Sequence, residues 1–165
     1  MKRVIVIGCP GSGKSTFSRA LHKKTGLPLY HLDMMFWNAD KTTVKREVFL
    51  ERLSAVLESD EWIIDGNYSS SLEMRMAVCD TVIFLDYPLD VCLYGIKERV
   101  GKPRSDMPWI EIEEDSEFID FIKGYGRDQK PNVVKLLEKY RNKEIIIFKS
   151  RKEADAFLNN EYSYL

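Results

Sequence analysis

The stretch from Gly8 to Ser15 has the residue types and the spacing of a loop that binds phosphate. It fits the pattern G-x-x-x-x-G-K-[ST] at every specified position, with an extra glycine at position 11. Glycine tolerates the backbone angles with which successive N–H groups turn toward one anion, and a helix that begins here adds its own unpaired N–H groups. The lysine brings a positive charge to the β- and γ-phosphates, and the last serine offers a hydroxyl to Mg²⁺. We therefore predict that a nucleotide and Mg²⁺ bind at Gly8, Cys9, Pro10, Gly11, Ser12, Gly13, Lys14, Ser15 and Thr16.

A short apolar run precedes this loop, and similar runs alternate with amphipathic stretches along the chain. We predict strands at 4–7, 29–32, 62–64, 81–85 and 145–148, and helices at 14–24, about 45–58 and 151–158. This alternation indicates right-handed β-α-β units and a parallel sheet with helices on both faces. Ligands of such sheets bind beyond the carboxyl ends of the strands, where the loop, Asp33, residues 65–68 and Asp86 are expected to lie.

Residues from about 99 to 127 have the weakest periodicity and the strongest charge contrast. Basic residues crowd positions 97–104, and an acidic stretch follows at 111–117. We interpret the segment as a lid within one domain that covers residues 1–165. A solvated helical hairpin, whose opposite charges pair, is the alternative. No helical period is evident in residues 159–165, so the sequence does not decide whether they pack on the domain.

The composition describes an ordinary globular chain with no strong overall charge. Of its 165 residues 44% are hydrophobic and 31% are charged, with 25 basic against 26 acidic residues and a net charge of −1. We therefore do not expect direct binding to nucleic acid, which requires a clustered positive surface. No apolar run approaches the roughly 18–20 residues that span a bilayer, and the run before Gly8 is too short for a signal peptide. The three cysteines form no CxxC pair, which favours reduced thiols and a cytoplasmic protein. The sequence does not indicate an oligomeric state.

Further motifs give the chain a resemblance that covers nearly its whole length. They are I-G-x-x-G-S-G-K-S-T at the start, His31-Leu32-Asp33 with Trp37 four residues later, the run 62–68 (Trp-Ile-Ile-Asp-Gly-Asn-Tyr), Arg75 before Cys79-Asp80, the run 82–88, Arg99, and Phe148-Lys149-Ser150. With these motifs the chain resembles the nucleoside monophosphate kinase-like superfamily of P-loop proteins. Within it, the chain is most similar to the adenylate-kinase-related family labelled putative DNA topology modulation proteins. The resemblance implies a three-layer α/β P-loop NTPase fold, with a five-stranded parallel sheet in the order 2-3-1-4-5 and a small helical lid.

The resemblance also implies roles for single residues. Asp33 would bind or deprotonate the hydroxyl of an acceptor, unless it only caps the next helical turn. Asp65 would hold Mg²⁺ together with Ser15, unless it only forms a turn with Gly66. Lys14 and the lid arginines Arg99 and Arg104 would offset the charge of ATP during transfer. The acceptor site would include Asp33, Trp37, Gly66, Asn67, Tyr68 and Arg75. Trp37 could equally be a core residue, and Arg75 a solvated arginine on a helix face.

These expectations predict an ATP- and Mg²⁺-dependent kinase that phosphorylates a hydroxylated metabolite or a nucleoside. A small GTPase would carry N-K-x-D, which does not occur here. A nucleoside monophosphate kinase is the alternative, although the arginine of the adenylate kinase motif D-G-F-P-R is missing after Asp65-Gly66. Shikimate kinases carry D-x-D and G-G-G, of which this chain has only Asp33 and a single Gly66. An alternative from another class of function is an ATP-binding regulator of DNA topology, as the family label suggests.

Overall fold

Five parallel strands form one sheet in the computed structural model, which describes residues 1–159. The strands are β1 (Arg3–Gly8), β2 (Leu29–His31), β3 (Trp62–Asp65), β4 (Thr81–Leu85) and β5 (Glu144–Phe148). Their order is β2-β3-β1-β4-β5, which confirms the sheet predicted from the resemblance. β1 is central, with Val4 beside Ile63 of β3 and Thr81 of β4. Because both faces of β1 are covered, its residues from Val4 to Ile7 are fully buried.

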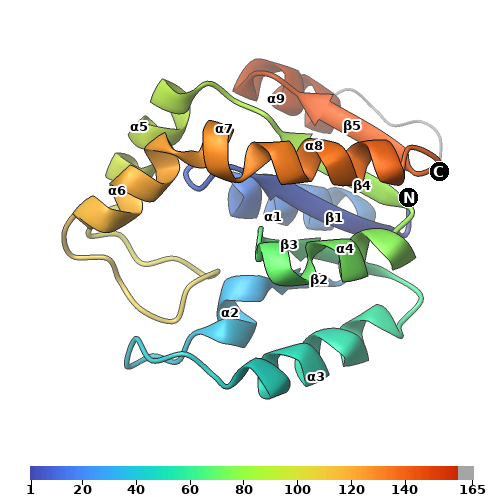
Figure 1. Cartoon of the computed structure of the whole chain (residues 1–165), viewed down its shortest axis with the longest axis horizontal. Helices are drawn as coiled ribbons and strands as arrows, with labels where there is room; N and C mark the ends of the chain where they lie inside the picture. The colour runs from blue at the N-terminus through green and yellow to red at the C-terminus, as the bar shows by residue number, and fades with distance from the viewer. Residues whose placement is uncertain (160–165) are drawn as a thin grey trace.

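Helices cover both faces of this sheet (Figure 1). One core cluster contains Val4 and Val6 together with residues of α1 (Lys14–Thr25), α5 (Leu89–Arg99), α6 (Ser116–Lys123), α7 (Tyr125–Asp128) and α9 (Arg151–Asn159). The other core cluster contains Ile5 and Ile7 together with residues of α3 (Arg46–Leu57), α4 (Ser69–Val78) and α8 (Lys130–Lys139). Successive strand residues point to opposite faces, and this alternation produces the two separate cores.

The strand and helix predictions hold for most of the chain, with one difference that affects the site. β2 ends at His31, and Asp33 lies in the first turn of a short helix, α2 (Leu32–Phe36), and not at a strand end. Residues 100–115 form a loop without regular elements, followed by α6 and α7, within the segment interpreted as a lid. Asn159 ends α9, and residues 160–165 lie outside the described residues. Within residues 1–159, no helix is long and apolar enough to cross a membrane.

Candidate functional site

The loop between β1 and α1 has the conformation that its sequence predicts. Gly11 and Gly13 have φ angles of 84° and 94°, in the left-handed region that favours glycine. The amine of Lys14 donates to the carbonyl oxygens of Gly8 at 3.0 Å and Cys9 at 3.3 Å, so it folds back over its own loop. Burial lowers the pKa of Lys14, against the charges of Asp65 and Asp33, which raise it. The lysine and the two carboxylates therefore lie close enough to influence one another's ionisation.

The backbone of the loop approaches the backbone of α5 closely. A Cβ atom at position 11 would lie 2.0 Å from the carbonyl oxygen of Cys92, and one at position 95 would lie 2.0 Å from that of Gly11. Both positions therefore require glycine for close approach, and not only for backbone freedom. Cys9 and Ser12, two of the predicted binding residues, are buried, 5% and 2% exposed.

Asn67 and Arg75 support the loop from the β3 side. Asn67 accepts from the Gly8 N–H at 3.1 Å and donates to the Gly8 carbonyl at 2.6 Å. The guanidinium of Arg75 donates to the backbone carbonyls of Gly66 (2.9 Å), Asn67 and Tyr68 (3.3 Å). Arg75 is fully buried and does not line the cavity described below. The interpretation of Arg75 as a solvated helix residue is therefore wrong, because its guanidinium is buried and binds the backbone of the 66–68 turn. Its role as a substrate ligand stays a prediction.

Asp65 forms a hydrogen bond with a histidine to which the sequence analysis assigns no role in the site. The Oδ2 atom of Asp65 lies 2.6 Å from Nδ1 of His31, the last residue of the neighbouring strand. Burial acts to lower the pKa of His31, but the hydrogen bond and the charge of Asp65 outweigh it and raise the pKa. The pair thus lies at the carboxyl ends of β2 and β3, beside the phosphate loop, as the fold predicts for ligand-binding residues.

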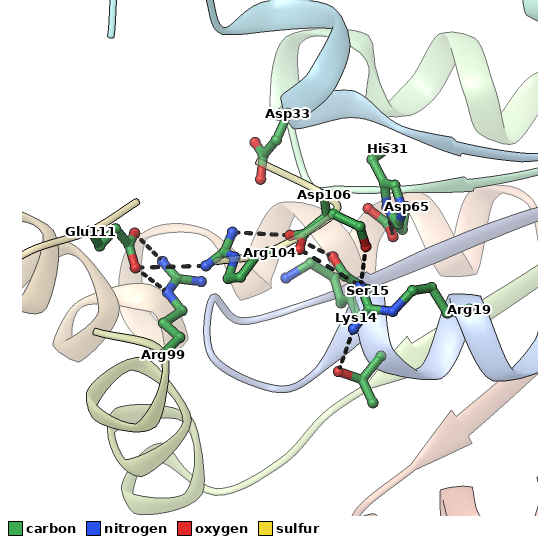
Figure 2. Close-up of polar contacts among 12 residues, drawn as sticks. Lys14, Ser15, Arg19, His31, Asp33, Asp65, Arg99, Arg104, Asp106 and Glu111 are labelled. Atoms are coloured by element: carbon green, nitrogen blue, oxygen red, sulfur yellow. Dashed lines mark hydrogen bonds and ion pairs between the residues drawn. The ribbon is translucent and has the colours of Figure 1, made fainter. Parts of the chain in front are cut away.

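Asp106, in the 100–115 loop, is an acidic group of the site that the sequence analysis did not predict. Its Oδ2 accepts from the Ser15 hydroxyl and from Nη2 of Arg104, both at 2.9 Å, and its Oδ1 lies 3.7 Å from Arg19. Figure 2 shows the carboxylate between Arg104 and Ser15. Asp106 is only 5% exposed; burial raises its pKa, but Arg104 and the Ser15 hydrogen bond outweigh burial and lower it. A carboxylate therefore occupies the place beside Ser15.

Arg99, at the end of α5, faces the same space. It donates through Nε and Nη2 to both oxygens of Glu111, at 2.7 and 2.9 Å (Figure 2). Burial and the neighbouring charge of Arg104 lower the pKa of Arg99, while Glu111 raises it. Arg104 itself lies 3.6 Å from Glu111. The two predicted lid arginines are thus together at the site, each neutralised by a carboxylate of the 100–115 loop.

Asp33 lies across the site from the phosphate loop, next to aromatic side chains. The Tyr68 hydroxyl donates to its Oδ1 at 2.5 Å, and the structure gives no hydrogen-bond partner for its Oδ2 among residues 1–159. Burial raises the pKa of Asp33, and the Tyr68 hydrogen bond and Lys14 only partly offset it. Because the side chain bonds Tyr68 and not the backbone of α2, Asp33 is not the helix cap considered as an alternative.

One cavity of about 1290 Å³ joins these groups. Of the predicted site residues, those that line it are Pro10, Gly11, Gly13, Lys14, Ser15, Thr16, Asp33, Trp37, Asp65, Gly66, Asn67, Tyr68, Arg99 and Arg104. Those that do not are Gly8, Cys9, Ser12 and Arg75. Since a pocket of roughly 300–1,000 Å³ holds one small molecule, this cavity has room for a nucleotide and a second, small ligand.

The donor groups fit Mg²⁺ that retains water and phosphate oxygens. Ser15, Asp65 and Asp106 bring a hydroxyl and carboxylates to the loop, and oxygen donors are what this ion prefers. Residues 1–159 contain no group of three or more His, Cys, Asp or Glu side chains that could hold a metal ion by themselves. The protein groups are therefore suited to a metal that arrives with a nucleotide, and not to a closed protein cage.

The chain is similar in structure to two shikimate kinases. That from Bacteroides thetaiotaomicron superposes with a TM-score of 0.58 and 21% identity, over 95% of this chain and 94% of the other. That from Aquifex aeolicus superposes with a TM-score of 0.54 and 20% identity, over 94% and 91%. No protein-family model matches the sequence, and no curated protein matches it significantly. At this identity the comparison establishes the fold of these P-loop kinases, and the chemistry must be argued from the site.

Proposed function

We propose that the protein transfers the γ-phosphoryl group of ATP to the hydroxyl of a small molecule. The observation that carries this proposal is the position of Asp33, whose partly buried carboxylate lines the same cavity as Lys14 and the phosphate loop. The acceptor oxygen forms a bond to the γ-phosphorus, the bond from that phosphorus to the β–γ bridging oxygen breaks, and ADP leaves. Asp33 takes the hydroxyl proton, for which a raised pKa makes it a better base than an exposed aspartate.

The remaining groups of the cavity act on the phosphates. The loop amides and Lys14 bind them, and Arg99 and Arg104 exchange Glu111 and Asp106 for phosphate oxygens as charge develops. Mg²⁺, when bound beside Ser15, screens the β- and γ-phosphates. We propose that the 100–115 loop acts as the lid, because it carries Arg104, Asp106 and Glu111 into the site.

A coupled assay of ADP formation, run alongside calorimetric titration of ATP, tests this function. We expect Lys14→Ala to abolish ATP binding, whereas Lys152→Ala, an exposed lysine of α9, leaves it unchanged. We expect Asp33→Asn to bind ATP normally and to lose turnover by about 10²- to 10⁴-fold, the usual contribution of a general base. The control is Asp155→Asn, also on the exposed part of α9.

Two results would overturn the proposal. If no acceptor raises ADP formation above background and Lys14→Ala still binds ATP, the site is not that of a kinase. DNA binding that is independent of ATP and falls steeply with salt would instead support the regulator of DNA topology.

A further inference from the structure

Aromatic side chains enclose the side of the cavity that holds Asp33. Phe36, Trp37, Tyr68 and Trp109 line it, from α2, the segment after it, the 66–68 turn and the 100–115 loop. The Trp37 and Trp109 rings meet edge to face at 5.8 Å, and those of Phe36 and Tyr68 at 5.0 Å. We call these four residues and Asp33 the acceptor side.

These aromatic groups differ from those of the core because they are half-buried and border the cavity. Trp62 of β3, by comparison, is fully buried, whereas each of the four retains exposed surface. The indole N–H of Trp109 is a buried donor with no hydrogen-bond partner in residues 1–159. An unpaired buried donor costs free energy, so an occupant that brings a carbonyl or a ring nitrogen would stabilise this arrangement.

The acceptor side also lacks an arginine of its own. Arg19 and Arg104 pair with Asp106, Arg99 pairs with Glu111, and Arg75 lies beneath the 66–68 turn. Under the proposed function, Arg99 and Arg104 move to the phosphates of ATP. Lys41, 5.1 Å from the Trp109 ring centre, is exposed. Binding of a second phosphate usually uses bidentate arginines, so the site does not suit a nucleotide as acceptor.

We propose that the acceptor is an uncharged alcohol with a planar ring, of the nucleoside class. Its ring lies against Trp37 and Trp109, its hydroxyl reaches the free oxygen of Asp33, and its carbonyl or ring nitrogen accepts from the Trp109 N–H. This inference rests on the proposed kinase function and specifies its substrate class. The hydroxyl loses its proton to Asp33 as its oxygen bonds to the γ-phosphorus, which yields a phosphate ester and ADP.

Calorimetric titration with a panel of acceptors tests the inference. The full chain is saturated with Mg²⁺ and a non-hydrolysable ATP analogue, then titrated with adenosine, guanosine, cytidine and uridine. Their 5′-monophosphates and shikimate, a hydroxylated acid without an aromatic ring, are titrated in parallel. We expect at least one nucleoside to bind more tightly than its monophosphate and than shikimate. We expect Trp109→Leu to weaken that binding about 5- to 150-fold, the range for stacking of a base on an aromatic ring.

Ile110→Ala is the matched control. Ile110 neighbours Trp109 in the 100–115 loop, is 44% exposed and does not line the cavity. We expect it to leave nucleoside binding unchanged, and both variants to keep the affinity of the parent chain for the ATP analogue, which also reports that they are folded.

The failures of the two proposals are distinguishable. If the ATP analogue binds but no nucleoside does, or if a monophosphate or shikimate binds more tightly, the acceptor class is wrong and the kinase function stands. If a nucleoside binds equally to Trp109→Leu and to the parent chain, the placement of the ring is wrong. If the ATP analogue itself does not bind, the proposed function fails.

Discussion

Replacement of Arg75 by methionine tests whether this buried arginine supports the site from beneath. Methionine retains much of the apolar stem but removes the guanidinium hydrogen bonds to the carbonyls of Gly66, Asn67 and Tyr68, of which only that of Tyr68 has another donor among residues 1–159, Ser71. Three hydrogen bonds to a charged group, at about 1.5–3 kcal/mol each, give a gross loss of about 5–9 kcal/mol. Removal of a buried charge returns several kcal/mol, so we expect the free energy of unfolding to fall by about 3 kcal/mol.

Urea denaturation followed by circular dichroism measures this loss. With a slope of about 2 kcal/mol per molar urea, a decrease of about 3 kcal/mol lowers the midpoint by about 1.5 M. Arg141→Met is the control, because the Arg141 side chain is 80% exposed and pairs only with Glu138; we expect no more than about 0.5 kcal/mol there.

The same variant separates support from direct substrate contact. Because Asn67 also holds Gly8, we expect looser binding of both ATP and acceptor in Arg75→Met, together with the lower midpoint. A variant with the stability of the parent chain and a loss confined to one phosphate-bearing ligand would refute this reasoning, and would support Arg75 as a ligand.

Three further changes probe other contacts. Gly95→Ala places a Cβ atom 2.0 Å from the carbonyl oxygen of Gly11, so we expect the affinity for ATP, measured by calorimetry, to fall about ten-fold or more. Gly126→Ala is the control, because a Cβ atom there meets open space, and we expect it to have no effect. The pKa of His31 is raised above 6.5, so its pairing with Asp65 stabilises the fold at low pH, and this contribution is lost as the pH rises above 6.5. We expect the urea midpoint of the parent chain to change with pH in this range, and His31→Gln to remove that dependence. An unchanged pH dependence in His31→Gln would contradict the pairing. Asp106→Asn removes a negative charge from the phosphate site, so ATP in EDTA should bind about ten-fold more tightly, and equal or weaker binding would count against a competing carboxylate.

Local patterns predicted much of the fold and the phosphate loop. The apolar run at 4–7, the glycines at 11 and 13 and the helix from Lys14 are set by residues within one short stretch, and the structure has them where they were predicted. The sheet order came from the resemblance and not from periodicity. The end of β2 was misplaced because His31, Leu32 and Asp33 carry no signal that separates a strand end from a first helical turn.

The site contacts that sequence reasoning missed join residues distant along the chain. Ser15 and Asp106 are 91 residues apart, and His31 and Asp65 are 34 apart. Nothing in the spacing marks Asp106 within a charged segment, although an aspartate two residues after an arginine in a candidate lid was a usable signal. The burial of Arg75 was missed because a helix pattern cannot show that this side chain reaches the backbone carbonyls of the 66–68 turn.

The backbone contact between the phosphate loop and α5 determines which parts of the site can move together. Gly11 rests on Cys92 and Gly95, so the body of α5 cannot shift without displacing the loop. Any hinge for the 100–115 loop must therefore lie beyond Gly95, and Gly101, with a φ of 75°, follows the end of α5. Arg99 then belongs to the stationary part, whereas Arg104 and Glu111 belong to the moving part. Opening would therefore break the ion pair between Arg99 and Glu111, keep that between Arg104 and Glu111, and leave Arg99 behind with the phosphates.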